Sequence, residues 1–324
     1  SRPPPPQDMV RIELFPGLLL DLRPVALTEA FGGGFIWTGQ AEGPRPGWAD
    51  LVIRDGRITG LVTVLGPQPR NYRIDPVAPG GIHRITELEG RDFPPEAHSP
   101  GRGHDHDHTD GDTDGHSDGH SGGPTRSVRA MPASPDDTSL ATIDVLIAYT
   151  AAAADSVADI QAQANLGVSL ANTGLQRSHV HARLRLVGTH AVQGYAETGD
   201  AGMLEALRAG TLPAFRAVHE AREALGADVV ALLTQTGNFC GIAYLGNPIL
   251  FADDDEWAFS ITRIDCVGNH TFAHEIAHNM GLNHDRAVES PAPATQYNFG
   301  HVSLPGRFLT VMSYFNACIT NNVT

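Results

Sequence analysis

The chain has 324 residues, with 37 acidic against 22 basic side chains and a formal net charge of −15. This balance argues against binding to nucleic acid or to an anionic membrane surface. Hydrophobic residues make up 41% of the chain, which is enough for packed cores, yet no apolar run approaches the roughly 18–20 residues that span a bilayer. The length exceeds that of a typical single domain, so we expect two units joined by a linker.

Residues 1–99 contain short apolar runs that are separated by glycine and proline. Asp55 and Gly56 lie between two of these runs, and this dipeptide is a strong signal for a β-hairpin turn. The segment therefore predicts a small β-rich domain.

Residues 100–137 have a different composition, and within residues 104–120 five histidines and six aspartates are interspersed with glycine, serine and threonine. Such a segment cannot bury a core, so we expect a solvated linker; weak loading with Zn²⁺ is the alternative interpretation. Arg126 and Arg129 lie near prolines in this exposed stretch. We expect activation cleavage between about residues 120 and 140.

Residues 138–324 show an α/β (α+β) pattern, in which strand-like and helix-like segments alternate. This alternation predicts a mainly parallel sheet. The expected segments are a strand at Ile143–Tyr149, a helix at Ala151–Ser178, strands near Ala182–Val187 and Asp228–Leu233, a helix at Leu212–Leu225 closed by Gly226, and short strands at Gly241–Gly246 and Trp257–Ile264.

The stretch from His274 to Asp285 has the spacing of a zinc site. On a helix, His274 and His278 lie on one face, and Glu275 is next to them. Gly281 can end the helix in a left-handed turn, which would return His284 to the same metal ion. Three imidazoles leave the fourth position of a tetrahedral zinc open, as in catalytic sites, and Glu275 is then the expected general base. A chance motif with surface histidines is the alternative.

This stretch resembles the zinc-binding consensus of the metzincin endopeptidases, and Asp285 after the third histidine resembles the reprolysin branch. Downstream, Val311–Tyr314 resembles the methionine turn beneath the metal, with Met312 as its floor. Residues 1–99 are similar in layout to the propeptides of bacterial secreted reprolysin-like peptidases, which include the peptidyl-Asp metallopeptidases.

The resemblance implies one catalytic Zn²⁺, polypeptide substrates, and a metzincin-type catalytic domain with an active-site helix, inhibited by its own N-terminal propeptide. It also implies that an extended peptide pairs with the edge strand formed by Gly241, Ile242, Ala243 and Tyr244; a plain edge strand is the alternative. Tyr314 resembles the tyrosine of astacins and serralysins, which approaches the zinc and stabilises the oxyanion. A packing role for Tyr314 stays open.

Inhibition by the N-terminal half cannot use a thiolate, because residues 1–239 contain no cysteine. We therefore expect a carboxylate, an imidazole or steric cover, with Asp or His of residues 98–120 as the source. Preference for aspartate on the primed side of the scissile bond would require a basic pocket. Arg286 and Arg307 are candidates, although both could be ordinary surface ion-pair residues.

The three cysteines, Cys240, Cys266 and Cys318, allow one disulfide and are compatible with secretion. We expect Cys240 to pair with Cys266, which would tie the edge strand to the segment before the active-site helix. Only twelve residues follow Met312, so we expect a short or truncated C-terminal subdomain. The protein is thus expected to be a secreted, monomeric zymogen whose leader is already missing. The alternative is a secreted metal-binding or adhesion protein with an inactive metzincin-like domain, which the intact Glu275 disfavours.

Overall fold

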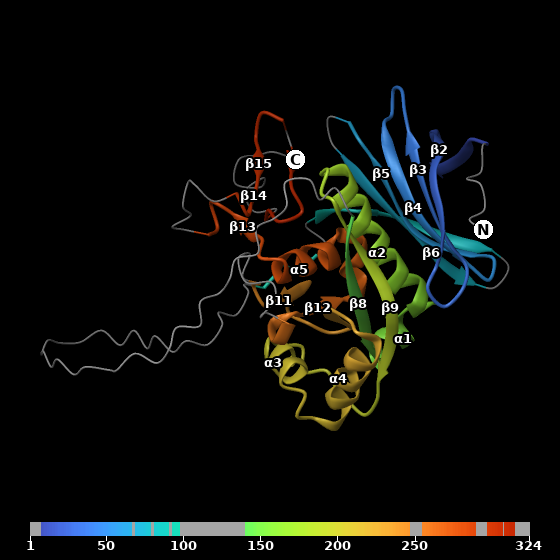
Figure 1. Cartoon of the computed structure of the whole chain (residues 1–324). Helices are drawn as coiled ribbons and strands as arrows, with labels where there is room; N and C mark the ends of the chain where they lie inside the picture. Colours follow the sequence, from blue (N-terminus) through green and yellow to red (C-terminus); the bar gives the residue numbers. More distant parts are fainter. Residues whose placement is uncertain are drawn as a thin grey trace, which may run out of the picture.

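The computed structural model describes residues 8–66, 69–78, 81–90, 93–97, 140–246, 255–289, 297–306 and 308–314. The predictions made for the 100–137 linker, Arg307 and Cys318 lie outside these residues. The described part is a mixed α/β structure with two main sheets (Figure 1). None of its helices is both long and apolar enough to cross a bilayer.

Strands β1–β7 form a seven-stranded antiparallel sheet in chain order, which we call the N-terminal sheet. The expected hairpin at Asp55–Gly56 is confirmed, because Arg54 pairs with Arg57 and both turn residues have positive φ, 48° and 71°. The strands are β1 (Val10–Phe15), β2 (Leu18–Glu29), β3 (Phe35–Ala41), β4 (Gly47–Arg54), β5 (Arg57–Val64), β6 (Arg70–Ala78) and β7 (Ile82–Leu88).

A five-stranded sheet, the central sheet, has the order β11-β12-β10-β8-β9. Its pairs β8·β9, β8·β10 and β10·β12 are parallel, and β11 is antiparallel to β12. Across all described sheets antiparallel pairs are the majority, so the expectation of a mainly parallel sheet holds for the central sheet and not for the structure as a whole. The strands are β8 (Ala141–Thr150), β9 (Ala182–Val192), β10 (Val229–Thr234), β11 (Gly241–Ala243) and β12 (Phe259–Arg263).

The prediction of one helix from Ala151 to Ser178 is wrong, because the structure has two helices there. The side chain of Asp159 accepts a hydrogen bond from Ala162 N and starts a new helix, so a cap interrupts an alanine-rich stretch of high helix propensity. A helix at Gly202–Ala209 was not predicted. The helices are α1 (Ala151–Ser156), α2 (Ile160–Arg177), α3 (Gly202–Ala209), α4 (Pro213–Leu225) and α5 (Thr271–Asn279).

Short elements complete the region around α5. The 3₁₀ helices are η3 (Asp255–Trp257) and η4 (Ile264–Asn269), and the two-stranded sheets pair β13 (Asn283–Asp285) with β14 (Phe299–Gly300) and β15 (Val302–Ser303) with β16 (Phe308–Leu309).

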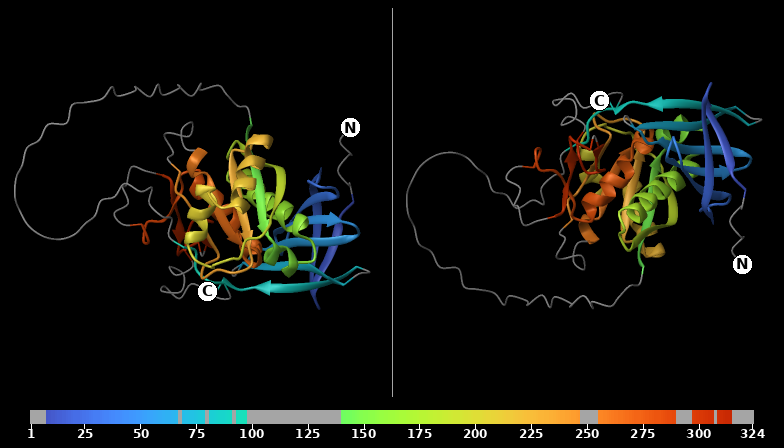
Figure 2. Two further views of the ribbon diagram at one scale, coloured as in Figure 1. Left: turned by 90° about the horizontal axis from the view of Figure 1, so that it is seen from below. Right: turned by 90° about the horizontal axis from the view of Figure 1, so that it is seen from above.

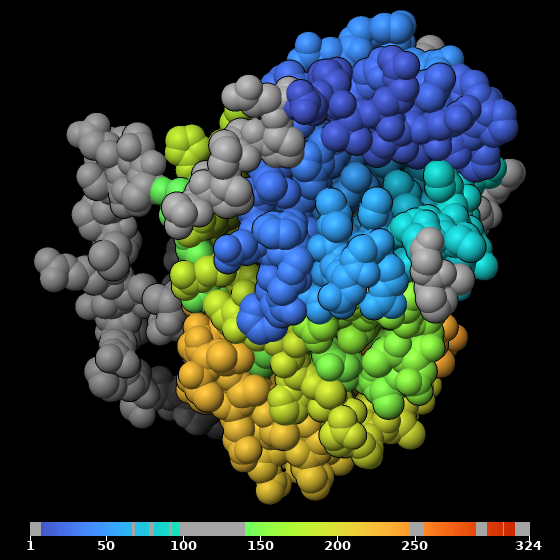
Figure 3. All heavy atoms as spheres, turned by 90° about the vertical axis from the view of Figure 1, so that its right-hand side faces the viewer, coloured from blue at the N-terminus to red at the C-terminus, as the bar shows by residue number. Residues whose placement is uncertain are grey.

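Helix α2 lies between the two main sheets (Figures 1 and 2). Val52 and Leu61 of the N-terminal sheet belong to the same buried cluster as Leu166 of α2 and Val145 and Ile147 of the central sheet. In the space-filling view the N-terminal sheet lies directly against the second half of the chain (Figure 3). The helix is therefore covered on both sides, and the two halves share one core.

Candidate active site

Helix α5 is anchored by its apolar face, because Phe272 and Ile276 are buried in the core cluster that contains α2. Gly167 of α2 makes the close approach possible, since a Cβ there would lie 3.1 Å from Cγ of Phe272. With this face fixed, His274 and His278 both reach the buried site beside the helix, as the four-residue spacing predicts.

The structure brings the three predicted histidines together. One ligand nitrogen from each of His274, His278 and His284 lies within 4.8 Å of the others, and all three side chains are buried. The Nε2 atoms of His278 and His284 are 3.0 Å apart. His274 Nε2 is buried and has no hydrogen-bond partner among the described residues.

The other nitrogen of each ring is held in place. His274 Nδ1 lies 2.7 Å from Val311 O, and His278 Nδ1 lies 2.7 Å from Leu282 O. His284 Nδ1 lies 2.8 Å from a carboxylate oxygen of Glu289. Because each Nδ1 faces an acceptor, it carries the proton, and the Nε2 lone pairs are left for a metal.

Protonation at the site also fits a metal centre. Burial lowers the pKa of His274 from 6.5 to about 4, and burial with the neighbouring imidazoles holds the pKa of His278 well below its ordinary value. Three imidazoles with converging nitrogens fit one tetrahedral Zn²⁺ with an open fourth position.

The segment after α5 turns back as expected. Gly281 has a φ of 88°, a left-handed conformation that suits glycine, and it leads into β13, which carries His284. Asp285 then accepts a hydrogen bond from Tyr314 N at 3.0 Å. This bond ties the third histidine to the methionine turn.

Met312 is 4% exposed and lies in that turn. Gly300 of β14 packs directly on it, since a Cβ there would lie 2.7 Å from the carbonyl of Met312. The turn is also bonded to α5 through the Val311 carbonyl and His274. Met312 therefore lies in a segment bonded to both elements that carry the three histidines, α5 and β13, which is consistent with its expected place as the floor.

Glu275 is completely buried, and neither of its carboxylate oxygens has a hydrogen-bond partner among the described residues. Burial raises the pKa of Glu275 well above its ordinary value, and the nearby carboxyl of Glu96 raises it further. Gly241 of β11 lies against it, because a Cβ at Gly241 would be 2.6 Å from Cγ of Glu275. A side chain at position 241 would thus displace the glutamate.

The edge beside β11 is covered by the chain's own residues 93–97. Ala97 N donates to Gly241 O at 2.9 Å, and Cys240 N donates to Pro95 O at 3.0 Å. Both bonds follow the two segments in the same order, so the covering segment runs parallel to β11. The strand is three residues long and ends before Tyr244, whose hydroxyl donates to Glu205.

Glu96 is a site residue that sequence reasoning missed. Its Oε1 accepts from Thr271 Oγ1 at 2.7 Å, and its backbone oxygen accepts from the Tyr314 hydroxyl at 3.2 Å. Oε2 is buried without a partner among the described residues, and burial raises the pKa of Glu96 to about 7. Glu96 comes two residues before the segment in which a blocking group was expected. It has no local pattern that marks it.

Tyr314 lies at the site, as expected for either of its proposed roles. Its ring centroid is 4.2 Å from that of His284 and 6.4 Å from that of His274. Burial, with the nearby acids Glu275 and Glu96 adding to it, raises the pKa of Tyr314, so the hydroxyl keeps its proton and remains a donor.

Two features brace the edge strand. Cys240 and Cys266 form the expected disulfide, which joins the residue before β11 to η4. Asn279, at the end of α5, donates from Nδ2 to the carbonyls of Tyr244 and Phe259 at 2.9 and 3.1 Å. Together they fix β11 and β12 against the helix that carries the histidines.

Arg286 lies one residue after β13 and is exposed. Its guanidinium stacks 4.4 Å from the centroid of the Phe299 ring. Both residues line a hollow of about 470 Å³ with Tyr297 and His301.

Known proteins resemble this chain in sequence and fold. The profile of the family described as metallo-peptidase family M12B, reprolysin-like, matches residues 139–324. A peptidyl-Asp metalloendopeptidase of Pseudomonas aeruginosa is 31% identical over 204 residues, covering 56% of this chain and 33% of the relative. A protein of the same name from Stenotrophomonas maltophilia strain K279a is 27% identical over 303 residues, covering 87% of this chain and 66% of the relative. The chain thus spans between one third and two thirds of these relatives.

Among solved structures, the crystal structure of metalloproteinase-II from Bacteroides fragilis matches with a TM-score of 0.50 at 10% identity. The match covers 89% of this chain and 85% of that one. It therefore extends over both main sheets, and at this identity it indicates a shared fold.

In metal-free protein, the contribution of His274 to stability should be lost as the pH falls from about 6.5 to 4. The pKa of His274 is about 4 in the folded state and 6.5 otherwise, so only the unfolded chain takes up the proton within that window. The histidine's contribution is complete above pH 6.5 and amounts to roughly 3 kcal/mol. Melting curves at pH 7.5 and 4.5 measure it.

The wild type is compared with the His274→Asn variant. Glu96 and Glu275 have raised pKa values, so they change stability with pH in the direction opposite to His274, and they do so in both proteins. The variant should lose less stability than the wild type between the two pH values. Equal losses would show that His274 is not buried as a neutral ring.

Proposed function

The chain belongs to the reprolysin-like metallopeptidase family M12B, and we propose that it is a zinc-dependent endopeptidase made as an inactive precursor. One observation carries the proposal. The three histidine Nε2 atoms converge beside a buried Glu275 whose oxygens are unpartnered among the described residues, next to the edge of β11. A structural zinc site has no use for such a carboxylate, whereas hydrolysis requires a base at this position.

His274, His278 and His284 would hold the ion. When bound there, Zn²⁺ supplies a water ligand of lowered pKa and polarises the scissile carbonyl. Glu275 accepts the proton of the attacking water and returns it to the leaving amine.

Tyr314 supports the same reaction as a hydrogen-bond donor. Its hydroxyl keeps its proton at neutral pH and lies beside the histidine cluster. In the structure it donates to the backbone of Glu96, so it becomes available for a developing oxyanion once that segment leaves.

Polypeptides are the proposed substrates, bound by main-chain pairing along Gly241–Ala243. What supports this is that the same edge already accepts residues 95–97 by backbone hydrogen bonds. The relatives named peptidyl-Asp metalloendopeptidase suggest recognition of aspartate. Arg286, on the wall of the hollow beside β13, is the candidate cation for that role.

We further propose that residues 1–99 act as an inhibitory propeptide and that the enzyme functions outside the cell. Residues 95–97 cover the edge strand, and the Glu96 carboxyl lies beside Glu275, where substrate and water would enter. The Cys240–Cys266 disulfide suits an oxidising compartment. Cleavage in the linker would allow the segment to leave.

Glu275→Gln should reduce turnover about 10²–10⁴-fold while zinc stays bound, because the base is lost and the ligands remain. The test uses chain that has been cut in the linker and separated from the N-terminal piece. It is incubated with a denatured protein, with and without a chelator, and mass spectrometry maps the cleavage sites and any preference for aspartate.

Glu220→Gln, an exposed change on α4, is the matched control and should be fully active. Zinc binding without any cleavage by the wild type would support the metal-binding alternative. Loss of zinc along with turnover in Glu275→Gln would assign the glutamate a structural role.

The intact chain should be at least tenfold less active than the cut and separated enzyme. Glu96→Ala should restore part of the activity without any cut, because it removes the carboxyl beside Glu275 and its bond to Thr271. Glu87→Ala, which affects an exposed ion pair on β7, should leave the intact chain inactive. The measurement is the rate at which one peptide is hydrolysed by the intact chain, the cut and separated enzyme, and the two intact variants. Equal rates for the intact chain and the separated enzyme would reject inhibition by the N-terminal half.

Tyr314→Phe should lower turnover of the separated enzyme ten- to a thousandfold with little change in peptide affinity, because only the donor to the transition state is removed. The comparison of kcat with KM measures this. An unchanged kcat would leave Tyr314 with a packing role.

A further inference from the structure

The outer side of α2 is a polar stripe that contacts the N-terminal sheet. Asn165, Ser169, Thr173 and Arg177 follow one another at intervals of four residues, so they lie on one face of the helix. Each of them touches the N-terminal sheet or the loop between β2 and β3, as the contacts below show. Beside the stripe, apolar residues of α2 such as Leu166 and Leu170 belong to the buried cluster that also contains Val52 and Leu61 of the N-terminal sheet and Val145 and Ile147 of the central sheet.

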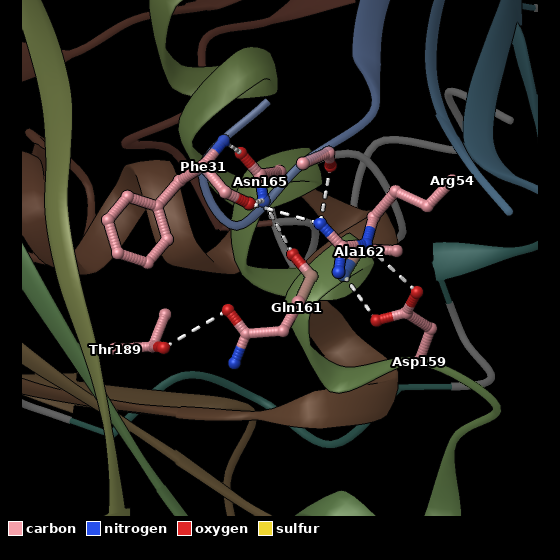
Figure 4. Close-up of polar contacts among 8 residues, drawn as sticks. Phe31, Arg54, Asp159, Gln161, Ala162, Asn165 and Thr189 are labelled. Carbon is pink, nitrogen blue, oxygen red and sulfur yellow. Dashed lines mark hydrogen bonds and ion pairs between the residues drawn. The ribbon is translucent and has the colours of Figure 1, made fainter. Parts of the chain in front are cut away.

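At one end of the stripe a set of polar contacts holds the loop between β2 and β3 (Figure 4). Asn165 accepts from Phe31 N at 2.8 Å and donates to Phe31 O at 3.1 Å. Arg54 Nε donates to Asp159 at 3.0 Å, and its Nη1 donates to the carbonyls of Phe31 and Gly33. The side chains of this ion pair are only 13% and 12% exposed, so solvent screens it less than a surface pair.

At the middle of the stripe lies a buried acid, Asp50 of β4, which is 1% exposed. Its Oδ1 accepts from Ser169 Oγ at 2.6 Å and from Thr173 Oγ1 at 2.8 Å. Its Oδ2 is buried without a partner among the described residues. If the Asp50 carboxyl is ionised, its buried Oδ2 weakens the contact between α2 and the N-terminal sheet, because burying a charge without a hydrogen-bond partner costs free energy.

The charged surroundings of Asp50 are simple. Thr38 and Leu61 lie opposite it on β3 and β5, and neither titrates. Of the groups on α2, Arg177 is the charge that acts on it, from a position stacked 4.0 Å over the Trp48 ring. Burial raises the pKa of Asp50, and the two hydroxyls and Arg177 oppose this only in part.

A polar helix face tolerates exposure to solvent after its partner dissociates, whereas permanent interfaces are more hydrophobic. We propose that the α2 stripe remains a docking surface for the N-terminal half after the chain is cut in the linker, and that buried Asp50 weakens this docking as the pH rises. Cutting alone then leaves the inhibitory segment in place at acid pH. This inference rests on the proposed precursor organisation.

The direction follows from linkage. Released Asp50 has an ordinary pKa near 3.8, and docked Asp50 has a higher one, so the docked state binds more protons between the two values. Affinity therefore falls as the pH rises through that window, by at most about tenfold per pH unit, and is constant above it. Glu96 and Glu275 in the cleft act in the same direction, so variants must separate the contributions.

The test uses the full chain with a site-specific protease sequence placed within residues 104–138. After cutting, the complex is diluted at pH 5 and at pH 8, and gel filtration measures how much N-terminal fragment stays with the remainder. For the wild type, the dissociation constant should be at least tenfold larger at pH 8 than at pH 5. The readout counts fragments and needs no hydrolysis, so it stands even if the protein is not a peptidase.

Asp50→Asn keeps an acceptor for Ser169 and Thr173 but carries no charge, so its pH ratio should fall severalfold and its complex should persist at pH 8. Glu96→Gln should retain the Asp50 contribution. Asp21→Asn, an exposed acid on the same sheet, should behave as wild type. Thr173→Val, a second variant in case Asp50→Asn folds poorly, should weaken docking more at pH 8 than at pH 5.

A fragment that leaves at once at pH 5 would overturn the docking surface. A wild-type pH ratio near one would overturn the role of Asp50, as would an unchanged ratio in both Asp50→Asn and Thr173→Val.

Discussion

The site depends on three hydrogen bonds that fix the Nδ1 side of the imidazoles. His274 is held by the Val311 carbonyl, His278 by the Leu282 carbonyl and His284 by Glu289. The acceptors come from the methionine turn, from the turn after α5 and from the segment after β13. Because each bond sets both the orientation of a ring and its tautomer, the position of the Nε2 cluster depends on all three segments at once.

This arrangement concentrates unpaired groups in the interior. His274 Nε2, both oxygens of Glu275 and one oxygen of Glu96 are buried without partners among the described residues. Buried groups of this kind destabilise a fold unless they serve a ligand or a reaction. These groups lie beside the edge of β11, which the chain covers with its own residues 95–97. The covering segment shields the site and brings Glu96 next to Glu275.

The sequence predicted the parts of the site that depend on local spacing. His274 and His278 are four residues apart on one helix, and a left-handed Gly281 returns the chain to His284, so no distant contact was needed to infer them. Glu96 could not be inferred in this way, because its position depends on backbone pairing with residues more than 140 positions away. The break before α2 was missed because the capping of one aspartate, Asp159, outweighs helix propensity.

The polar stripe of α2 illustrates a further limit. A helix covered on both sides is expected to be apolar all round, and a stripe of Asn165, Ser169 and Thr173 would ordinarily indicate a face in water. A helix that is covered on both sides and still has a polar face is expected if it has to be stable in two states, one with the N-terminal sheet in contact and one without it. Hydroxyl and amide groups bond equally well to Asp50 and Phe31 or to solvent, whereas leucines there would bind the sheet too permanently. On the docking proposal, polarity at this buried face is what would allow the shared core to separate.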